Sequence, residues 1–191
     1  MTAPDLRPQL AASQEWVATL IDGVRPEQLD SPTPCDDFTV GELIEHMLAV
    51  EERVRRIGAD GVLGDAQQRV VLPTGDLGAA VREAAARAHA AWDDDSRLTA
   101  IVSPPWGDVP GAAALGGYVQ EHLTHGWDLA VATGQPAEAD PHLVEPVLQA
   151  AMTFVPAAPR GGPIPFGDVV EPAADAGPTE RLANYLGRNS R

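Results

Sequence analysis

The 191-residue sequence predicts a mainly α-helical protein, and two observations support this prediction. Apolar residues recur at intervals of three to four in successive segments, which is the spacing of one face of a helix. Residues that favour helix ends, among them Thr39, Gly134 and Asp140, stand at the borders of these segments. Since 44% of the residues are apolar, the chain is long and apolar enough to bury one core.

The first half of the chain contains three helical segments. Residues 5–22 carry an apolar stripe and predict the first helix. The second is expected to begin at Thr39 and to run to about Ile57, because Thr39 and Glu42 match a capping box, in which each side chain bonds the other residue's backbone amide. The Ala-rich residues 76–92 predict the third helix.

The second half begins with residues 93–111, in which turn-favouring acidic and proline residues lie on either side of an expected extended segment. A fourth helix covers residues 117–134 and is expected to end at Gly134, which can adopt the left-handed conformation common after a helix. Residues 140–155 predict a fifth helix with Asp140 as its N-cap.

The C-terminal part of the chain differs in composition from the rest. Residues 156–178 are rich in Pro and Gly and predict an extended arm, followed by a short helix expected to begin with Thr179 and to end at Gly187. The expected division is therefore a helical bundle in 1–155 and, in 156–191, an arm and short helix that pack on it. The apolar residues that alternate in the arm include Ile164, Phe166 and Val169.

Composition excludes several classes of function. The chain has 28 acidic and 13 basic residues, so its net charge of −15 repels nucleic acids. It contains no apolar run long enough for a membrane span and begins without the pattern of a secretion signal, and its one cysteine suits a reducing compartment. We therefore expect a cytoplasmic protein that binds neither nucleic acid nor membranes.

The fourth helical segment, which contains "GYVQEHLTHGWDLAVATG", is unusually rich in ionisable groups. Glu121 and His125 are four residues apart and stack on one face, so both can bind a single divalent ion. His46 lies toward the apolar side of the second helix and could supply a third ligand. Three protein ligands leave positions open, as in a catalytic site, and Asp128 could hold the second imidazole nitrogen.

Less specific interpretations of the same residues are also open. A Glu and a His four apart are often an exposed pair, and His46 could be a boundary histidine with one satisfied nitrogen. Tyr118 could line a pocket, donate a hydrogen bond to substrate or simply pack. Two further histidines, His89 and His142, are expected at the surface or at a helix start. Cys35 is expected to be a small buried apolar residue, since no base is near it in sequence.

Three segments, "TPCDDFTVGELIEHM", "THGWDLAVATGQP" and "AGPTERLANYLGR", together resemble an actinobacterial family of DinB-like metal-binding proteins. These proteins are relatives of the N-terminal domain of mycothiol-dependent maleylpyruvate isomerase. The resemblance implies a DinB-like four-helix bundle that binds zinc or nickel through positions matching His46, Glu121 and His125. Because many DinB-like proteins have histidine in place of the glutamate, His122 is a reserve ligand.

The resemblance also implies a function. It suggests a divalent-metal-dependent enzyme, a thiol transferase or isomerase, that activates a low-molecular-weight thiol such as mycothiol, or water, for attack on a small electrophilic substrate. The isomerase has a further C-terminal domain that contributes to its active site, whereas this chain has only the short arm and helix. The alternatives are a non-catalytic protein that binds or sequesters a small molecule in the bundle, and a protein whose metal is structural. A homodimer is one assembly that the sequence allows.

Overall fold

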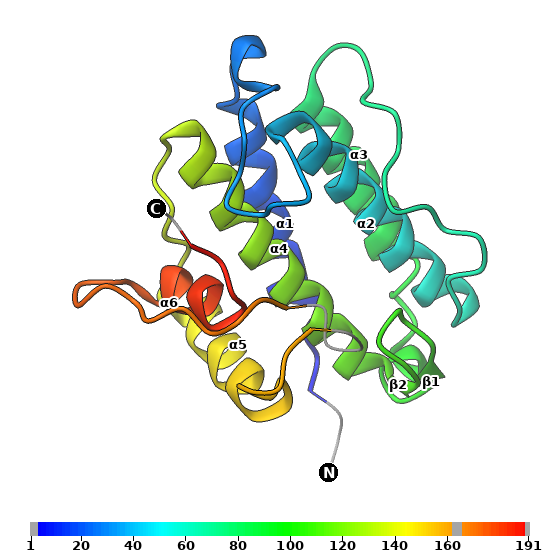
Figure 1. The fold of residues 1–191 in the computed structure, drawn as a ribbon. Helices are drawn as coiled ribbons and strands as arrows, with labels where there is room; N and C mark the ends of the chain where they lie inside the picture. The colour runs from blue at the N-terminus through cyan, green and yellow to red at the C-terminus, as the bar shows by residue number, and fades with distance from the viewer. Residues whose placement is uncertain (1–3, 162–165, 190–191) are drawn as a thin grey trace.

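The computed structural model describes residues 4–161 and 166–189, and its regular structure is almost entirely helical (Figure 1). The helices are α1 (Arg7–Asp22), α2 (Val40–Asp60), α3 (Leu77–Ala90), α4 (Gly111–Thr133), α5 (Pro141–Phe154) and α6 (Pro178–Tyr185). Two short 3-10 helices, η1 (Pro26–Gln28) and η2 (Asp95–Leu98), lie between them, and β1 (Ile101–Val102) pairs antiparallel with β2 (Val109–Pro110). The predicted mainly α-helical fold is confirmed.

Helices α1 to α4 form the expected four-helix bundle. In Figure 1, α4 runs diagonally through the molecule, with α2 and α3 on one side and α5 and α6 on the other. Helix α1 packs against α3 and α4, and α2 packs against the same two helices. Helices α5 and α6 pack against each other and against α4. Because α4 has neighbours on both sides, several polar groups along it, among them His122, His125 and Asp128, are buried.

The predicted helix ends in the bundle are confirmed at three places. The Thr39 side chain accepts from the Glu42 amide at 3.4 Å, and the Glu42 carboxylate accepts from the Thr39 amide at 2.9 Å. Helix α4 ends at Thr133 and is followed by Gly134, the predicted stop, whose φ of 70° is left-handed. Asp140 caps α5 by accepting from the His142 amide at 2.9 Å. Helix α4 begins at Gly111, six residues before the expected start.

The expected start of α6 at Thr179 is wrong. The helix begins at Pro178, which lacks the amide hydrogen that would otherwise need a partner at this position. The Glu138 carboxylate accepts from the amides of Thr179 and Glu180, at 3.0 and 3.1 Å. The Thr179 hydroxyl instead accepts from the Ala139 amide at 3.0 Å. A residue from another segment therefore caps this helix, which local sequence patterns do not reveal.

The core extends from the four-helix bundle to α6. The indole of Trp92 is fully buried and donates to the Val54 carbonyl at 2.9 Å, which joins the end of α3 to α2. On the other side of α4, Leu182 and Leu186 from the C-terminal helix are fully buried in a cluster that also contains residues of α2, α4 and α5. Each fully buried leucine contributes about 1.5–3 kcal/mol relative to an exposed one.

The arm contains no helix or strand within the described residues 156–161 and 166–177. Phe166 is partly buried against the core, Val169 is 41% exposed, and Ile164 lies outside the described residues. The division into 1–155 and 156–191 stays a prediction. None of the helices in the described part of the chain has the length and apolar character that crossing a bilayer requires.

Candidate metal centre

His46 reaches the interface between α2 and α4 from the second turn of α2. Its ring is 4% exposed and stacks on Phe38, with 4.8 Å between the ring centroids and 25° between the planes. The Nδ1 atom lies 3.0 Å from the Gln68 carbonyl. Because a carbonyl only accepts, Nδ1 donates, and in the neutral ring Nε2 keeps its lone pair. The 61–76 connection after α2 thus orients this imidazole toward α4.

Glu121 and His125 face His46 from successive turns of α4. Glu121 Oε1 lies 3.1 Å from His46 Nε2 and 3.7 Å from His125 Nε2. The two rings are 5.0 Å apart, and one ligand atom from each of the three residues lies within 4.8 Å of the other two. His125 is buried, whereas 31% of the Glu121 side chain is exposed. The three residues predicted from the sequence as ligands therefore meet, with the carboxylate on the open side.

Asp128 lies behind His125, on the side away from Glu121. His125 Nδ1 and Asp128 Oδ2 are 3.0 Å apart, and Asp128 is completely buried. The same oxygen accepts from Arg188 Nε at 3.0 Å, and the guanidinium beside it favours the arrangement in which His125 Nδ1 donates to this oxygen. The predicted contact between Asp128 and an imidazole is present. As in many metal sites, an acceptor holds the outer nitrogen of the ring.

The three facing atoms form a set that matches a metal ion. With both Nδ1 atoms donating outward, two imidazole lone pairs and one carboxylate oxygen converge, and all three are acceptors. Such a set needs a cation or additional protons between its members. In a tetrahedral site with bonds of about 2.0 Å, neighbouring ligand atoms are about 3.3 Å apart. The two distances from Glu121 Oε1, 3.1 and 3.7 Å, bracket that value, and the two imidazole nitrogens lie within 4.8 Å of each other, so the spacing suits a divalent ion.

The electrostatics of the cluster favour an ionised Glu121. Burial by itself would raise the pKa of this carboxyl group, but when protons rather than a metal ion occupy the facing imidazole nitrogens, the hydrogen bond from His46 and the charges of His125 and His46 hold the pKa down at about 2. Glu121 is therefore a carboxylate at neutral pH, as a metal ligand must be.

His122, the reserve ligand, points into a different network. It is fully buried, with Nδ1 2.7 Å from the Tyr118 carbonyl and Nε2 2.8 Å from Glu51 Oε1. Glu51 is also buried, and its second oxygen accepts from Gln14 Nε2 at 2.5 Å. The pKa of His122 is raised because the Glu51 carboxylate outweighs the opposing effect of burial. In this arrangement His122 is bound to α2 as a buried ion pair and does not face the other three residues.

Cys35 lies closer to the centre than its sequence position indicates. It is 5% exposed, and its Sγ lies within 4.8 Å of ligand atoms of His125 and Asp128. Burial raises the pKa of the thiol. The expectation of a small buried residue is confirmed, but the chain does place a base nearby. No local pattern could show this, because 90 residues separate Cys35 from His125.

The remaining candidate residues lie outside the cluster. His142 is exposed at the start of α5, as expected, whereas His89 is half-buried and burial lowers its pKa. Tyr118 is 2% exposed, its hydroxyl has no hydrogen-bond partner among the described residues, and its ring packs edge-on against Trp106 at 5.2 Å.

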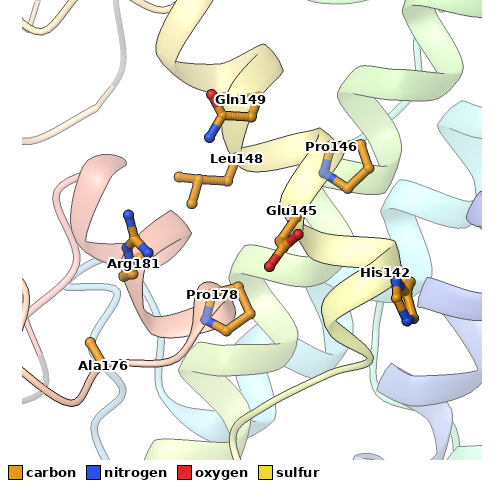
Figure 2. A pocket seen from close by; sticks show the side chains of 8 residues that line it. All are labelled: His142, Glu145, Pro146, Leu148, Gln149, Ala176, Pro178 and Arg181. Carbon is orange, nitrogen blue, oxygen red and sulfur yellow. The ribbon is translucent and has the colours of Figure 1, made fainter.

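Two of the cavities formed by the described residues lie away from the histidine cluster. One of about 470 Å³ lies between α5 and α6 (Figure 2), with His142 and Glu145 on one wall and Arg181 on the other. A second, of about 380 Å³, lies between α2 and α3. Neither is lined by His46, Glu121 or His125. The cluster is open to solvent where the Glu121 side chain is exposed.

The fold and the cluster together define a class: a DinB-like helical bundle with a His–Glu–His cluster between its second and fourth helices. Residues 10–130 match the model of the mycothiol maleylpyruvate isomerase N-terminal domain. The chain belongs to this family.

Relatives and solved structures agree with this assignment. Two uncharacterised Mycobacterium tuberculosis proteins, from strains CDC 1551 / Oshkosh and ATCC 25618 / H37Rv, are each 38% identical over 94% of this chain and 95% of their own length. A DinB-like protein from Bacillus subtilis matches with a TM-score of 0.57 and 14% identity, over 71% of this chain and 95% of that one. The mycothiol-dependent maleylpyruvate isomerase matches with a TM-score of 0.53 and 18% identity, over 78% of this chain and 70% of the isomerase chain. At these identities the two structures support the fold alone.

Proposed function

We propose that the protein is a divalent-metal-dependent enzyme that activates a low-molecular-weight thiol, or water, for attack on a small electrophile. One observation carries the proposal: three acceptor atoms of His46, Glu121 and His125 converge within 4.8 Å, while acceptors behind the two rings hold their outer nitrogens. Membership of a family named for a mycothiol-dependent isomerase supports a thiol as the nucleophile.

Each residue has a defined task in this proposal. His46 and His125 would hold the ion through Nε2, and Glu121 would hold it through its carboxylate. Zinc or nickel bound there would lower the pKa of a thiol or water at the open position. Phe38 stacks on His46 and restricts water on that side, which strengthens electrostatic interactions at the centre. The exposed part of Glu121 marks the face through which the nucleophile and the electrophile would enter.

Metal content tests the ligand assignment. Protein purified without a histidine tag should contain about one divalent ion per chain. His46→Ala and His125→Ala should each weaken zinc binding by more than about 100-fold, since losing a residue behind a ligand already costs roughly 10–100-fold. His89→Ala and His142→Ala are matched controls that should leave occupancy unchanged. Full occupancy in either of the first two variants would refute the assignment.

Turnover separates an enzyme from a protein that only binds. The metal-loaded protein should accelerate the reaction of mycothiol with a chromogenic aryl halide, and chelation should abolish the acceleration. If His125→Ala loses the metal but wild-type protein shows no turnover with mycothiol or with water as the nucleophile, the non-catalytic alternative of binding or sequestration replaces the proposal. Metal that raises the melting temperature without any turnover or ligand binding would indicate a structural ion.

A further inference from the structure

The C-terminal end of the described chain returns to α4 beside the candidate metal centre. The Arg188 amide donates to the Ala183 carbonyl at 2.9 Å, and the Arg188 carbonyl accepts from Asn184 Nδ2 at 3.0 Å. The backbone carbonyl of Asn184 in turn accepts from the Val170 amide at 3.0 Å. These bonds attach the backbone of Arg188 to α6 and attach α6 to the arm.

The turn that delivers Arg188 depends on a glycine. Gly187 has a φ of 87°, a left-handed conformation that disfavours side chains. A Cβ atom at Gly187 would also lie 2.6 Å from the backbone of Gly167 in the arm, closer than real Cβ contacts. The arm and the end of α6 therefore pack backbone to backbone, and this contact sets the direction in which the chain continues to Arg188.

The side chain of Arg188 ends at the residue that holds His125. Its Nε donates to Asp128 Oδ2 at 3.0 Å, and the same oxygen accepts from His125 Nδ1 at 3.0 Å. Asp128 is completely buried, and 16% of the Arg188 side chain is exposed. Removing one partner of a buried ion pair leaves an uncompensated charge and frees the other partner to move. Arg188 thus neutralises and orients the carboxylate behind the imidazole.

We propose that Arg188 is a positioning residue of the metal centre, which fixes the Asp128 carboxylate so that His125 presents Nε2 to the ion. The inference rests on the proposed metal site. It makes the C-terminal segment part of the site, although that segment supplies no ligand itself. The bundle alone would hold His46 and Glu121, whereas the orientation of His125 depends on a residue about 60 positions later in the chain.

The test compares arginine variants in the full-length chain. Zinc affinity is measured by competition with a chromophoric chelator, and Co²⁺ is then used at saturation to record the visible absorption spectrum of the site. Arg188→Gln should weaken zinc binding by roughly 10-fold, the lower end of the effect of groups behind a ligand, and should change the Co²⁺ spectrum. Arg188→Lys, which keeps the charge, should lose less affinity. Arg181→Gln, at an exposed position of α6, is the matched control.

The outcomes distinguish this inference from the proposed function. If wild-type protein binds zinc through His125 but Arg188→Gln has the same affinity and Co²⁺ spectrum, the positioning role is refuted and the metal site stands. If wild-type protein does not bind zinc, both fail. The metal-free melting temperature of each variant identifies general unfolding: equal losses of affinity in Arg188→Gln and Arg188→Lys that follow a lower melting temperature would mean a structural role, which also overturns the inference.

Discussion

Breaking the buried pair of Glu51 and His122 by removing one partner should strongly destabilise the fold, and the size of the loss gives a quantitative test. The two side chains are 1% and 0% exposed, and their charged atoms are 2.8 Å apart. His122 Nδ1 faces a carbonyl and Nε2 faces a carboxylate, so both nitrogens donate and the ring is charged. In Glu51→Ala the imidazole loses its counter-ion, and breaking a buried pair in this way costs about 3–5 kcal/mol.

Glu51→Gln provides a variant of nearly the same shape. Its amide can donate to a neutral His122 ring, and its oxygen can still accept from Gln14 Nε2, so the hydrogen bonds to His122 and to Gln14 are both retained. Hydrogen bonds to charged groups contribute about 1.5–3 kcal/mol and neutral ones about 0.5–1.5 kcal/mol. The expected loss is therefore about 1–2 kcal/mol, clearly less than for Glu51→Ala.

The pH dependence of stability gives the sharper measurement. The pKa of His122 is raised in the folded protein above its ordinary value of 6.5. Its stabilising contribution is therefore complete below about pH 6.5 and is lost as the pH rises through the folded-state pKa. Glu51→Gln removes the carboxylate that raises the pKa, so this loss of stability should disappear.

Urea unfolding of the metal-free proteins across pH 5 to 9 gives both the loss of unfolding free energy in each variant and the change of that free energy with pH. The difference between the wild-type protein and Glu51→Gln isolates the contribution of His122. A loss below about 1 kcal/mol in Glu51→Ala would show that the pair does not carry the charge inferred from its hydrogen bonds. The same conclusion would follow if the unfolding free energy declined with rising pH equally in Glu51→Gln and in the wild-type protein.

Two further substitutions test the packing of the helical core. Gly58→Ala should destabilise by about 1–2 kcal/mol in urea unfolding despite its better helix propensity, because the new Cβ would lie 2.6 Å from Trp92 Nε1 and 2.9 Å from the Ala91 carbonyl. Gly116→Ala, whose nearest neighbour is 3.4 Å away, is the control, and equal effects would contradict the reasoning. Tyr118→Phe should not lower the melting temperature, since its buried hydroxyl has no partner among the described residues. A loss of unfolding free energy above about 1 kcal/mol in Tyr118→Phe would show that the hydroxyl does make a hydrogen bond.

The sequence determined the local features of this protein. Spacing of apolar residues and the residues at helix ends predicted the main helices, because an α-helix is governed by neighbours three to four positions apart. The same periodicity placed Glu121 and His125 on one face, and it placed His46 toward the core. These positions suggested one candidate site of three ligands, and the family resemblance implied the same three residues.

Tertiary structure decided everything that depends on contacts between distant segments. His122 follows Glu121 directly and was the reserve ligand, but packing of α2 against α4 gave it a buried partner in Glu51. Packing of the arm and α6 brought Arg188 to Asp128. Such contacts depend on how helices rotate against each other, and a rotation of one residue turns a side chain by about 100°. Spacing along a single helix cannot contain that information.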